Sequence, residues 1–332
     1  MITVVIVNWN RKELLRACLR SLKAQENVIF ETIVVDNGSS DGSAEMAERE
    51  FGASVIRNRE NRGFCAANNQ GIAAAQGEFV ALLNNDAEAD PRWLAELERA
   101  CGSGQDIGMA ASKVLVWEDP RRIDKVGHLI FPDGQNRGRG AGALDLGQFD
   151  REEEVLWPDG CAAMYRKSML DEIGGFDEDF FAYGDDAELG LRARIAGWRC
   201  VYAPRAVVRH HRGATLGKDS GRRLELIERN RVLLAVKLFP WSLLWLNPVY
   251  FAMRLVAGAA MAGRGEGDTA HFPGVGGKLR ILRALVSGDW QALRMTPRML
   301  RKRAEIGRIR KLAPAEVRRL IMAHRLTLRE VA

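Results

Sequence analysis

Two amides and a carboxylate, Asn84-Asn85-Asp86, directly follow an apolar run at residues 79–83. An unbroken apolar run is typical of a strand buried on both faces of a parallel sheet. Ligands of such sheets bind at the carboxyl ends of the strands, so we expect Asp86 to lie where a ligand is held. The alternative is a simple turn, because Asn and Asp side chains bond readily to their own backbone.

Polar side chains end other predicted strands in the same way. Asn8 and Asn10 follow the apolar run at residues 2–7, and Asp36 follows the run at residues 32–35. The chain has no GxGxxG sequence after the first strand and no GxxxxGK[ST] sequence, which argues against a dehydrogenase-type dinucleotide site and a P-loop. A nucleotide at this edge would therefore be held by side chains and turn amides rather than by a glycine loop.

Strand and helix patterns alternate in the first part of the chain, and this alternation positions the polar strand ends at one edge. It predicts an α/β fold with a doubly wound, mostly parallel sheet. The expected strands cover residues 2–7, 32–35, 54–57 and 79–83, and the helices cover residues 11–24, a segment ending near residue 51, and residues 65–75.

The middle of the chain is less regular. We expect a helix at residues 91–101 and strands at residues 109–117 and 203–209, the last ending in His210-His211. Asp185-Asp186 precede an expected helix at residues 187–196. The segment 118–154 is rich in glycine and charge, which predicts either a long mobile loop near a site or a disordered insertion.

Composition places the 332-residue chain among ordinary globular proteins, with 47% hydrophobic and 28% charged residues. This length suits one large α/β domain with an appendage, or two domains. The five scattered cysteines contain no CxxC pair, which predicts reduced thiols in a cytoplasmic protein rather than a disulfide or zinc framework. The first residues lack a basic segment and predict a strand, not a signal peptide.

A series of short motifs in a fixed order resembles the family 2 glycosyltransferases, which are inverting enzymes with a GT-A fold, and most of all the bacterial rhamnosyltransferase-like group. The motifs extend over residues 1 to about 215. They are VIVNWN (5–10), VVDNGSSDG (34–42), NRGF (61–64) with NNQG (68–71), LLNND (82–86), DG (159–160), GFDE (175–178) with FFAYGDD (180–186), and HH (210–211).

The resemblance implies a metal site that neutralises the leaving diphosphate of a nucleotide-sugar. Asp86 matches the metal-binding carboxylate of the family's Asp-x-Asp motif, whose first position is Asn84 here. A single carboxylate suits Mg²⁺ or Mn²⁺, which keep several waters and bind the phosphates of the substrate. A histidine completes the site in related enzymes, and we favour His210 over His211 from its position in the motif.

The resemblance also implies a pyrimidine-nucleotide site. Asp36 matches the residue that accepts a hydrogen bond from N3–H of the base. Asn8 would frame the base, Arg62 would reach the diphosphate, and Asn84 would contact the sugar or ribose. The other nucleotide- or sugar-binding candidates are Asn10, Asn37, Gly63, Asn68 and Asn85.

Inversion in one step needs a base that takes the proton of the acceptor hydroxyl. Asp186 matches that residue, with Asp185 as the second candidate, and two adjacent acids are expected to raise the pKa of one of them. Acid capping of the helix is the alternative role for this pair. Asp159 and Gly160 are expected to border the acceptor, with Trp157 as a stacking candidate.

The region after residue 220 changes in character, so we divide the chain into a catalytic domain (1–220) and a helical, basic C-terminal region (221–332). Charged residues interrupt the apolar stretch 232–262, which favours helices in a membrane interface over a spanning helix. Trp241, Trp245 and Tyr250 suit such an interface. The basic residues 294–329 would add attraction to anionic lipid, or they form a solvated helix face. A helical subdomain packed on the core or on another subunit is the alternative.

Together these features predict a metal-dependent inverting hexosyltransferase. The expected donor is dTDP-L-rhamnose or a UDP-sugar, and the expected acceptor is a cell-surface polysaccharide or a lipid-linked glycan. We expect a cytoplasmic protein, peripheral on the inner face of the membrane, and no nucleic-acid partner, because aromatic residues do not interleave the basic tail. A sugar nucleotidyltransferase lacks support because no phosphate loop follows the first strand. The presence of Asp36, Asp86, Asp186 and a histidine together argues against a non-catalytic nucleotide-sugar-binding protein.

Overall fold

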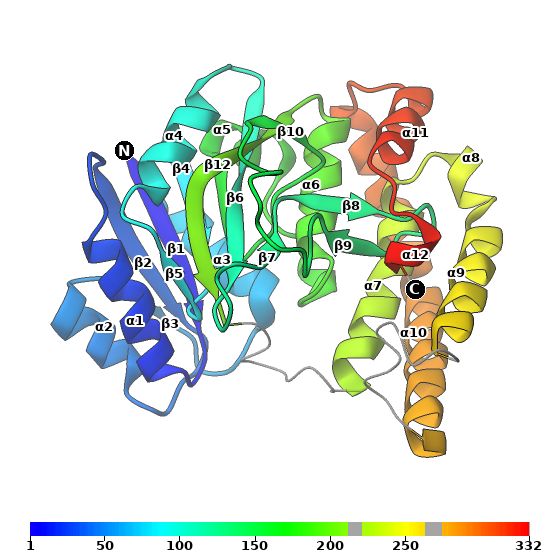
Figure 1. The fold of residues 1–332 in the computed structure, drawn as a ribbon, viewed down its shortest axis with the longest axis horizontal. Coiled ribbons are helices and arrows are strands. Elements are labelled where there is room, and N and C mark those ends of the chain that lie inside the picture. The colour runs from blue at the N-terminus through cyan, green and yellow to red at the C-terminus, as the bar shows by residue number, and fades with distance from the viewer. Residues whose placement is uncertain (212–220, 263–273, 332) are drawn as a thin grey trace. The chain divides into compact units, whose positions relative to one another are not determined.

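The computed structural model describes residues 1–211, 221–262 and 274–331. The chain forms two compact units (Figure 1). The α/β unit comprises Met1–His128 and Gly138–Ala214, and the helical unit comprises Leu129–Arg137 and Thr215–Ala332. Residues 129–137 therefore group with the helical unit, although we expected the first 220 residues to form a single domain.

The described residues of the α/β unit contain one ten-stranded mixed sheet. Its order is β10-β12-β6-β11-β4-β1-β2-β3, with β5 paired to β12 and β7 to β6. The strands are β1 (Ile2–Asn8), β2 (Phe30–Asp36), β3 (Ser54–Arg57), β4 (Phe79–Leu83), β5 (Ala87–Ala89), β6 (Ile107–Val116), β7 (Ile123–Lys125), β10 (Glu153–Val155), β11 (Ala162–Arg166) and β12 (Arg199–His210). A separate two-stranded sheet pairs β8 (His128–Ile130) with β9 (Asn136–Gly138).

The first half of the sheet confirms the predicted parallel, doubly wound arrangement. Strands β4, β1, β2 and β3 are neighbours in parallel. All five residues of β4 are buried, as expected for a strand covered on both faces. The helices of this unit are α1 (Lys12–Lys23), α2 (Ser43–Phe51), α3 (Gly63–Ala74), α4 (Trp93–Gly102), α5 (Lys167–Ile173) and α6 (Asp185–Ile195), with a 3₁₀ turn η1 at Glu178–Phe180.

The second half of the sheet is mixed, and its pairing brings distant residues to the edge where β4 ends. Strand β11 runs antiparallel to both β4 and β6, and β12 runs parallel to β6. Strand β5 follows Asp86 and pairs antiparallel with β12, so that Ala87 lies opposite His210. The sheet therefore places the histidine pair beside the Asn84-Asn85-Asp86 turn.

The segment 118–154 is not the loop or disordered insertion that we predicted. It contains β7, β8, β9 and β10, and two of its polar residues, Asp124 and His128, are buried. Strand β7 pairs with β6, with Lys125 opposite Val114. The strands are only three residues long, and glycines such as Gly127 take left-handed conformations between them. Short strands separated by glycines carry too little apolar periodicity to be recognised from sequence.

The helical unit packs around α7, and its described helices are α7 (Gly221–Leu238), α8 (Trp241–Leu244), α9 (Asn247–Ala262), α10 (Gly274–Ile309), α11 (Pro314–Ala323) and α12 (Leu328–Val331). Residues 233–238 of α7 are buried, so the start of the apolar stretch 232–262 belongs to a core and not to an exposed interface. The ring of Tyr250 packs edge-on against Phe131. Trp241 and Trp245 are exposed. None of the described helices has the length and apolar character needed to cross a membrane.

Candidate functional site

The carboxyl ends of β1, β2 and β4 bring three polar side chains into one buried cluster. Asn8 and Asp36 lie opposite each other in the β1–β2 register. Asn85 donates from Nδ2 to Asn8 Oδ1 at 2.7 Å, and Asn8 donates from Nδ2 to Ser43 Oγ at 2.8 Å. Asp36 Oδ2 accepts a hydrogen bond from the Ser39 amide at 3.0 Å. These predicted ligand-binding residues therefore lie together and hold one another in place.

Three of the predicted nucleotide-binding amides bond to the protein itself, two of them in loops and one within a helix. Asn37 donates from Nδ2 to Asn61 Oδ1 and accepts at Oδ1 from Asn58 Nδ2 and the Arg62 amide. Asn68 donates to the Phe64 carbonyl one turn earlier in α3. Asn10 Oδ1 accepts from the Ser40 amide. These side chains bond the chain itself in this structure, and their role in binding a nucleotide or sugar stays a prediction.

The remaining candidates of this edge are Arg62, Gly63 and Asn84, and they differ in exposure. Arg62 is exposed at the start of α3. Gly63 has φ +85° and lies so close to Phe181 that a Cβ would be 2.5 Å from the ring. Asn84 uses its backbone amide to bond the Cys161 carbonyl, and its side chain is half-buried. The side chains of Arg62 and Asn84 therefore differ from those of Asn10, Asn37 and Asn68, which bond to the protein itself.

Asp86, His210 and Asp124 form a buried line. His210 Nδ1 lies 2.9 Å from Asp124 Oδ2, and its other ring nitrogen, Nε2, lies 3.4 Å from Asp86 Oδ1. Burial alone would lower the pKa of His210, but the hydrogen bond to Asp124 and the nearby Asp86 carboxylate raise it to about 9. His211 stacks on Trp117 instead. The structure therefore directs His210, not His211, toward Asp86.

A second buried cluster surrounds the predicted base. His128 Nε2 lies 2.8 Å from Asp159 Oδ2 and 3.5 Å from Asp186 Oδ2. Lys125 Nζ lies 2.7 Å from the same Asp159 oxygen. The Lys125 ammonium also lies 4.0 Å from Asp124 Oδ2. Asp124 and Lys125 are consecutive in β7 and thereby connect the two clusters.

The charges of this cluster shift the pKa values of its acids in opposite directions. Burial acts to raise the pKa of Asp159, but Lys125 and His128 outweigh it and hold that pKa well below its ordinary range. Burial and the neighbouring charge of Asp186 raise the pKa of Asp185 well above its ordinary range. Burial also raises the pKa of Asp186, partly offset by His128. Asp159 is therefore ionised, and Asp185 is the acid that holds its proton most firmly.

A strained loop positions Asp185 and Asp186 at the start of α6. Phe181 and Tyr183 have φ values of 64° and 68°, and Gly184 precedes the helix with φ 70°. Left-handed backbone is costly for aromatic residues and persists only where the surroundings enforce it. Here the Phe181 carbonyl accepts hydrogen bonds from the Phe64 and Cys65 amides at the start of α3. The loop is therefore fixed to a second helix.

Trp157, which we predicted to stack on an acceptor, is fully buried in this structure. Its ring stacks with His128, with centroids 6.1 Å apart, and a Cβ at Gly190 of α6 would lie only 2.2 Å from Trp157 Cβ. Trp157 therefore supports His128 from within the core. Gly160 is adjacent to the base, because a Cβ there would be 3.8 Å from Asp186 Cβ.

Asp124, Lys125 and His128 were missed in the sequence because they fall in the segment read as a loop. A weak signal was available: the apolar residues Ile123 and Val126 bracket Asp124 and Lys125, as short buried strands do. The glycines that follow obscured it. These three residues complete the line from Asp86 to Asp186.

Two places in the α/β unit could hold a metal ion. The ligand atoms of His128, Asp159 and Asp186 lie within 4.8 Å of one another, but the Lys125 ammonium already bonds Asp159 and would compete with a cation. Asp86 Oδ1 is buried and has no hydrogen-bond partner among the described residues. A histidine whose other nitrogen bonds a carboxylate is the usual arrangement of a metal-ligating imidazole. The residues at Asp86 and His210 therefore fit a divalent cation best.

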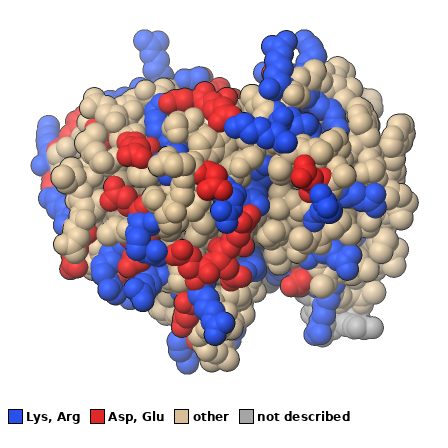
Figure 2. Space-filling model, turned by 90° about the horizontal axis from the view of Figure 1, so that it is seen from above, with Lys and Arg blue, Asp and Glu red and all other residues tan. Residues whose placement is uncertain are grey.

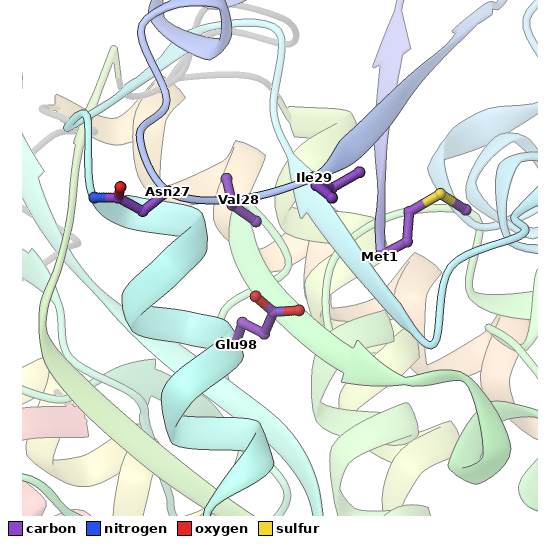
Figure 3. Close-up of a pocket in the computed structure, with 5 residues that line it drawn as sticks. All are labelled: Met1, Asn27, Val28, Ile29 and Glu98. Atoms are coloured by element: carbon purple, nitrogen blue, oxygen red, sulfur yellow. The ribbon is translucent and has the colours of Figure 1, made fainter.

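A cavity of about 610 Å³ lies elsewhere, at the amino end of β1 (Figure 3). Its labelled side chains are Met1, Asn27, Val28, Ile29 and Glu98. This lining offers one carboxylate and one amide among apolar groups, and it is not the edge where β1, β2 and β4 end. We therefore place the candidate site at the carboxyl edge.

Two protein-family models match the chain. The family model described as glycosyl transferase family 2 matches residues 3–174, and the model described as glycosyl transferase family group 2 matches residues 146–262. These matches include every candidate site residue named above.

Among curated relatives, the chain is 26% identical over 284 residues to N-acetylglucosaminyl-diphospho-decaprenol L-rhamnosyltransferase of Mycobacterium tuberculosis. That alignment covers 76% of this chain and 89% of the relative. The chain is also 26% identical to an uncharacterised protein of Sinorhizobium fredii, but it spans only 25% of that longer protein.

Two solved structures share the fold. A mannosyltransferase from Pyrobaculum calidifontis, solved with GDP-Man and Mn²⁺, has a TM-score of 0.56 and 18% identity, over 88% of this chain and 86% of that chain. GalNAc-T7, solved with UDP, GalNAc and Mn²⁺, has a TM-score of 0.61 and 15% identity, over 76% of this chain and 50% of that chain. At these identities the likeness concerns the fold.

Proposed function

The chain belongs to glycosyl transferase family 2 and is a glycosyltransferase of the GT-A fold, and we propose that it inverts the anomeric centre of a pyrimidine-nucleotide sugar. The observation that carries this proposal is the buried line of groups from Asp86 to Asp186. It joins a carboxylate suited to a cation with a carboxylate suited to proton transfer, which are the two needs of such a reaction.

The proposed donor is dTDP-L-rhamnose or a UDP-sugar. Asp36 is held by Ser39 at the end of β2, where its carboxylate would accept a hydrogen bond from N3–H of thymine or uracil. The rhamnosyl choice is supported by the name of the Mycobacterium tuberculosis relative. Exposed Arg62 would contact the diphosphate, and Asn84 the ribose or sugar.

The proposed cofactor is Mg²⁺ or Mn²⁺, held by Asp86 and His210. Both solved neighbours contain Mn²⁺, which supports a metal here. When bound, the ion would neutralise charge on the leaving diphosphate. The hydrogen bond between Asp124 and Nδ1 of His210 would orient the ring so that the other nitrogen, Nε2, faces Asp86.

Asp186 is the proposed general base. The acceptor oxygen bonds to the anomeric carbon, the bond from that carbon to the diphosphate breaks, and the hydroxyl proton passes to an Asp186 oxygen. Burial raises the pKa of Asp186, which makes it a stronger proton acceptor than an ordinary carboxylate. His128 orients Asp186 and balances its charge, while burial and the charge of Asp186 raise the pKa of Asp185 well above its ordinary range.

The proposed acceptor is a polysaccharide or lipid-linked glycan that approaches beside Gly160 and Asp159. The relative that acts on a decaprenol-linked sugar, according to its name, supports a lipid-linked acceptor. Such an acceptor would place the protein at the cytoplasmic face of the membrane, as a peripheral rather than spanning protein.

Isothermal calorimetry with dTDP, UDP and GDP, each with and without Mn²⁺, tests the donor proposal. We expect dTDP or UDP to bind at least tenfold more tightly with metal, and GDP to bind weakly. Hydrolysis of a panel of dTDP- and UDP-sugars then identifies the sugar. Metal-independent binding of all three nucleotides would overturn the proposed site.

A further inference from the structure

The charge of the chain is divided unevenly between its two units. The residues of the helical unit include 24 Lys and Arg against 10 Asp and Glu, a net charge of +14. Those of the α/β unit include 25 against 33, a net charge of −8. On the face drawn in Figure 2, most acidic side chains lie on the α/β unit, in agreement with its negative net charge. The overall net charge of +6 is therefore the sum of an acidic unit and a strongly basic unit. The basic unit attracts anionic partners.

Helix α10 in this basic unit carries two apolar faces. One face is buried and includes Ala284, Ala292 and Met299. At Gly288 on the same face the helix approaches α7 so closely that a Cβ would lie 2.8 Å from the Glu225 carbonyl. This face accounts for the packing of α10 within its unit.

The second apolar face of α10 is exposed. Its residues are separated by three, four or seven positions, which places them on one side of a helix, and each side chain is 41–62% exposed. By helical periodicity this side lies almost opposite the buried face. We call it the α10 stripe, and it consists of Leu279, Leu282, Val286, Trp290, Leu293 and Leu300.

Cations flank the α10 stripe. Arg283, Arg294 and Arg301 are exposed and by helical periodicity lie along one border of the stripe. The Arg294 guanidinium stands 5.0 Å from the Trp290 ring centroid. An apolar stripe that contains tryptophan and is bordered by arginine is the composition of helices that lie in a membrane interface.

From these observations we infer that the α10 stripe docks on the surface of an anionic phospholipid bilayer. Leucine, valine and tryptophan side chains enter the boundary between headgroups and acyl chains, and the flanking arginines pair with lipid phosphates. A second copy of this chain would bring two surfaces of like charge together. A nucleic acid would pair with the arginines but would leave the apolar side chains in water. Only the bilayer satisfies both parts of the surface.

Vesicle flotation with the full chain tests this inference. We expect binding to phosphatidylcholine vesicles that contain phosphatidylglycerol, weak binding to pure phosphatidylcholine vesicles, and release at high salt. The double variant Leu282→Gln, Leu293→Gln should bind the anionic vesicles about tenfold or more weakly, because it removes two inserted side chains. Leu146→Gln is the control, since Leu146 is an even more exposed leucine but belongs to the α/β unit, so that its replacement should leave binding unchanged.

Equal binding by the double variant and the parent chain, or no binding to anionic vesicles at low salt, would overturn the inference. Sedimentation velocity without lipid provides the second measurement. A dimer of the parent chain that dissociates in the double variant would assign the α10 stripe to a second copy and would also overturn it. No nucleotide-sugar is present in these experiments, so their outcome is independent of the proposed transfer reaction.

Discussion

His128 Nε2 lies 3.5 Å from Asp186 Oδ2, and the same nitrogen lies 2.8 Å from Asp159. The proposed base therefore faces an imidazole that belongs to a segment without obvious secondary structure in the sequence. Burial alone would lower the pKa of His128, but the Asp186 and Asp159 carboxylates outweigh it and raise that pKa. The His128 imidazole thus contacts both carboxylates and holds Asp186 in one orientation.

Asp186→Asn should reduce transfer by about a hundredfold to ten-thousandfold, the usual contribution of a general base. Nucleotide binding should stay nearly unchanged, because Asp186 does not lie at the end of β1, β2 or β4. Initial rates and calorimetry on the same preparation measure both quantities. Asp185→Asn is the matched control: because Asp186 and not Asp185 is the proposed base, this variant should retain most of the activity. Greater loss in Asp185→Asn than in Asp186→Asn would exchange their roles.

Asp124→Asn should weaken metal binding about 10- to 100-fold, because a carboxylate that orients a ligating histidine contributes this much. The change would appear as a higher Mn²⁺ concentration needed for half-maximal nucleotide binding in calorimetry. Asp119→Asn serves as control, since Asp119 pairs with Arg121 on the surface of the same segment. Unaltered metal dependence in Asp124→Asn would remove His210 from the metal site.

Lys125→Met should destabilise the α/β unit by about 3 kcal/mol, because it leaves Asp159 buried without its main cation. Denaturant unfolding monitored by tryptophan fluorescence gives the change in the free energy of unfolding. Lys167→Met removes a lysine from an exposed pair with Asp171 and should cost about 0.5 kcal/mol or less. If both variants lose the same small amount, the Lys125–Asp159 pair does not hold the cluster together.

The stability of the helical unit should depend on pH through Asp289 of α10. Burial and the neighbouring Glu228 raise the pKa of Asp289 from its ordinary value of 3.8 to about 6. Between these two values the unfolded chain has lost this proton while the folded chain keeps it, so stability from this group is present below about pH 4 and is lost as the pH rises through 6. Asp289→Asn cannot ionise. The Tm of this variant minus the Tm of the parent chain should therefore increase from pH 4 to pH 7. A constant difference in differential scanning fluorimetry would contradict this.

Local patterns in the sequence determined the first half of the fold. The runs that form β1 and β4 are uniformly apolar or nearly so, and β2 contains the apolar run 33–35. The helix between β1 and β2 repeats its buried residues Leu15, Cys18, Leu19 and Leu22 with helical spacing. Burial on both faces of a strand leaves a signal that neighbouring residues alone can carry. The edge at which Asn8, Asp36 and Asp86 meet follows from this pattern, since parallel strands end on the same side.

The tertiary structure decided which of these residues reach one another and which serve the loops. His210 faces Asp86 only because β5 pairs with β12, a contact between residues more than 100 positions apart. Asp124, Lys125 and His128 enter the site only because β7 adds to β6. Trp157 is buried because Gly190, which has no side chain, lets α6 pack directly against it. Hydrogen bonds and close packing between distant segments leave no periodic pattern in the local sequence. The line of groups from Asp86 to Asp186 could therefore be recognised only in the folded chain.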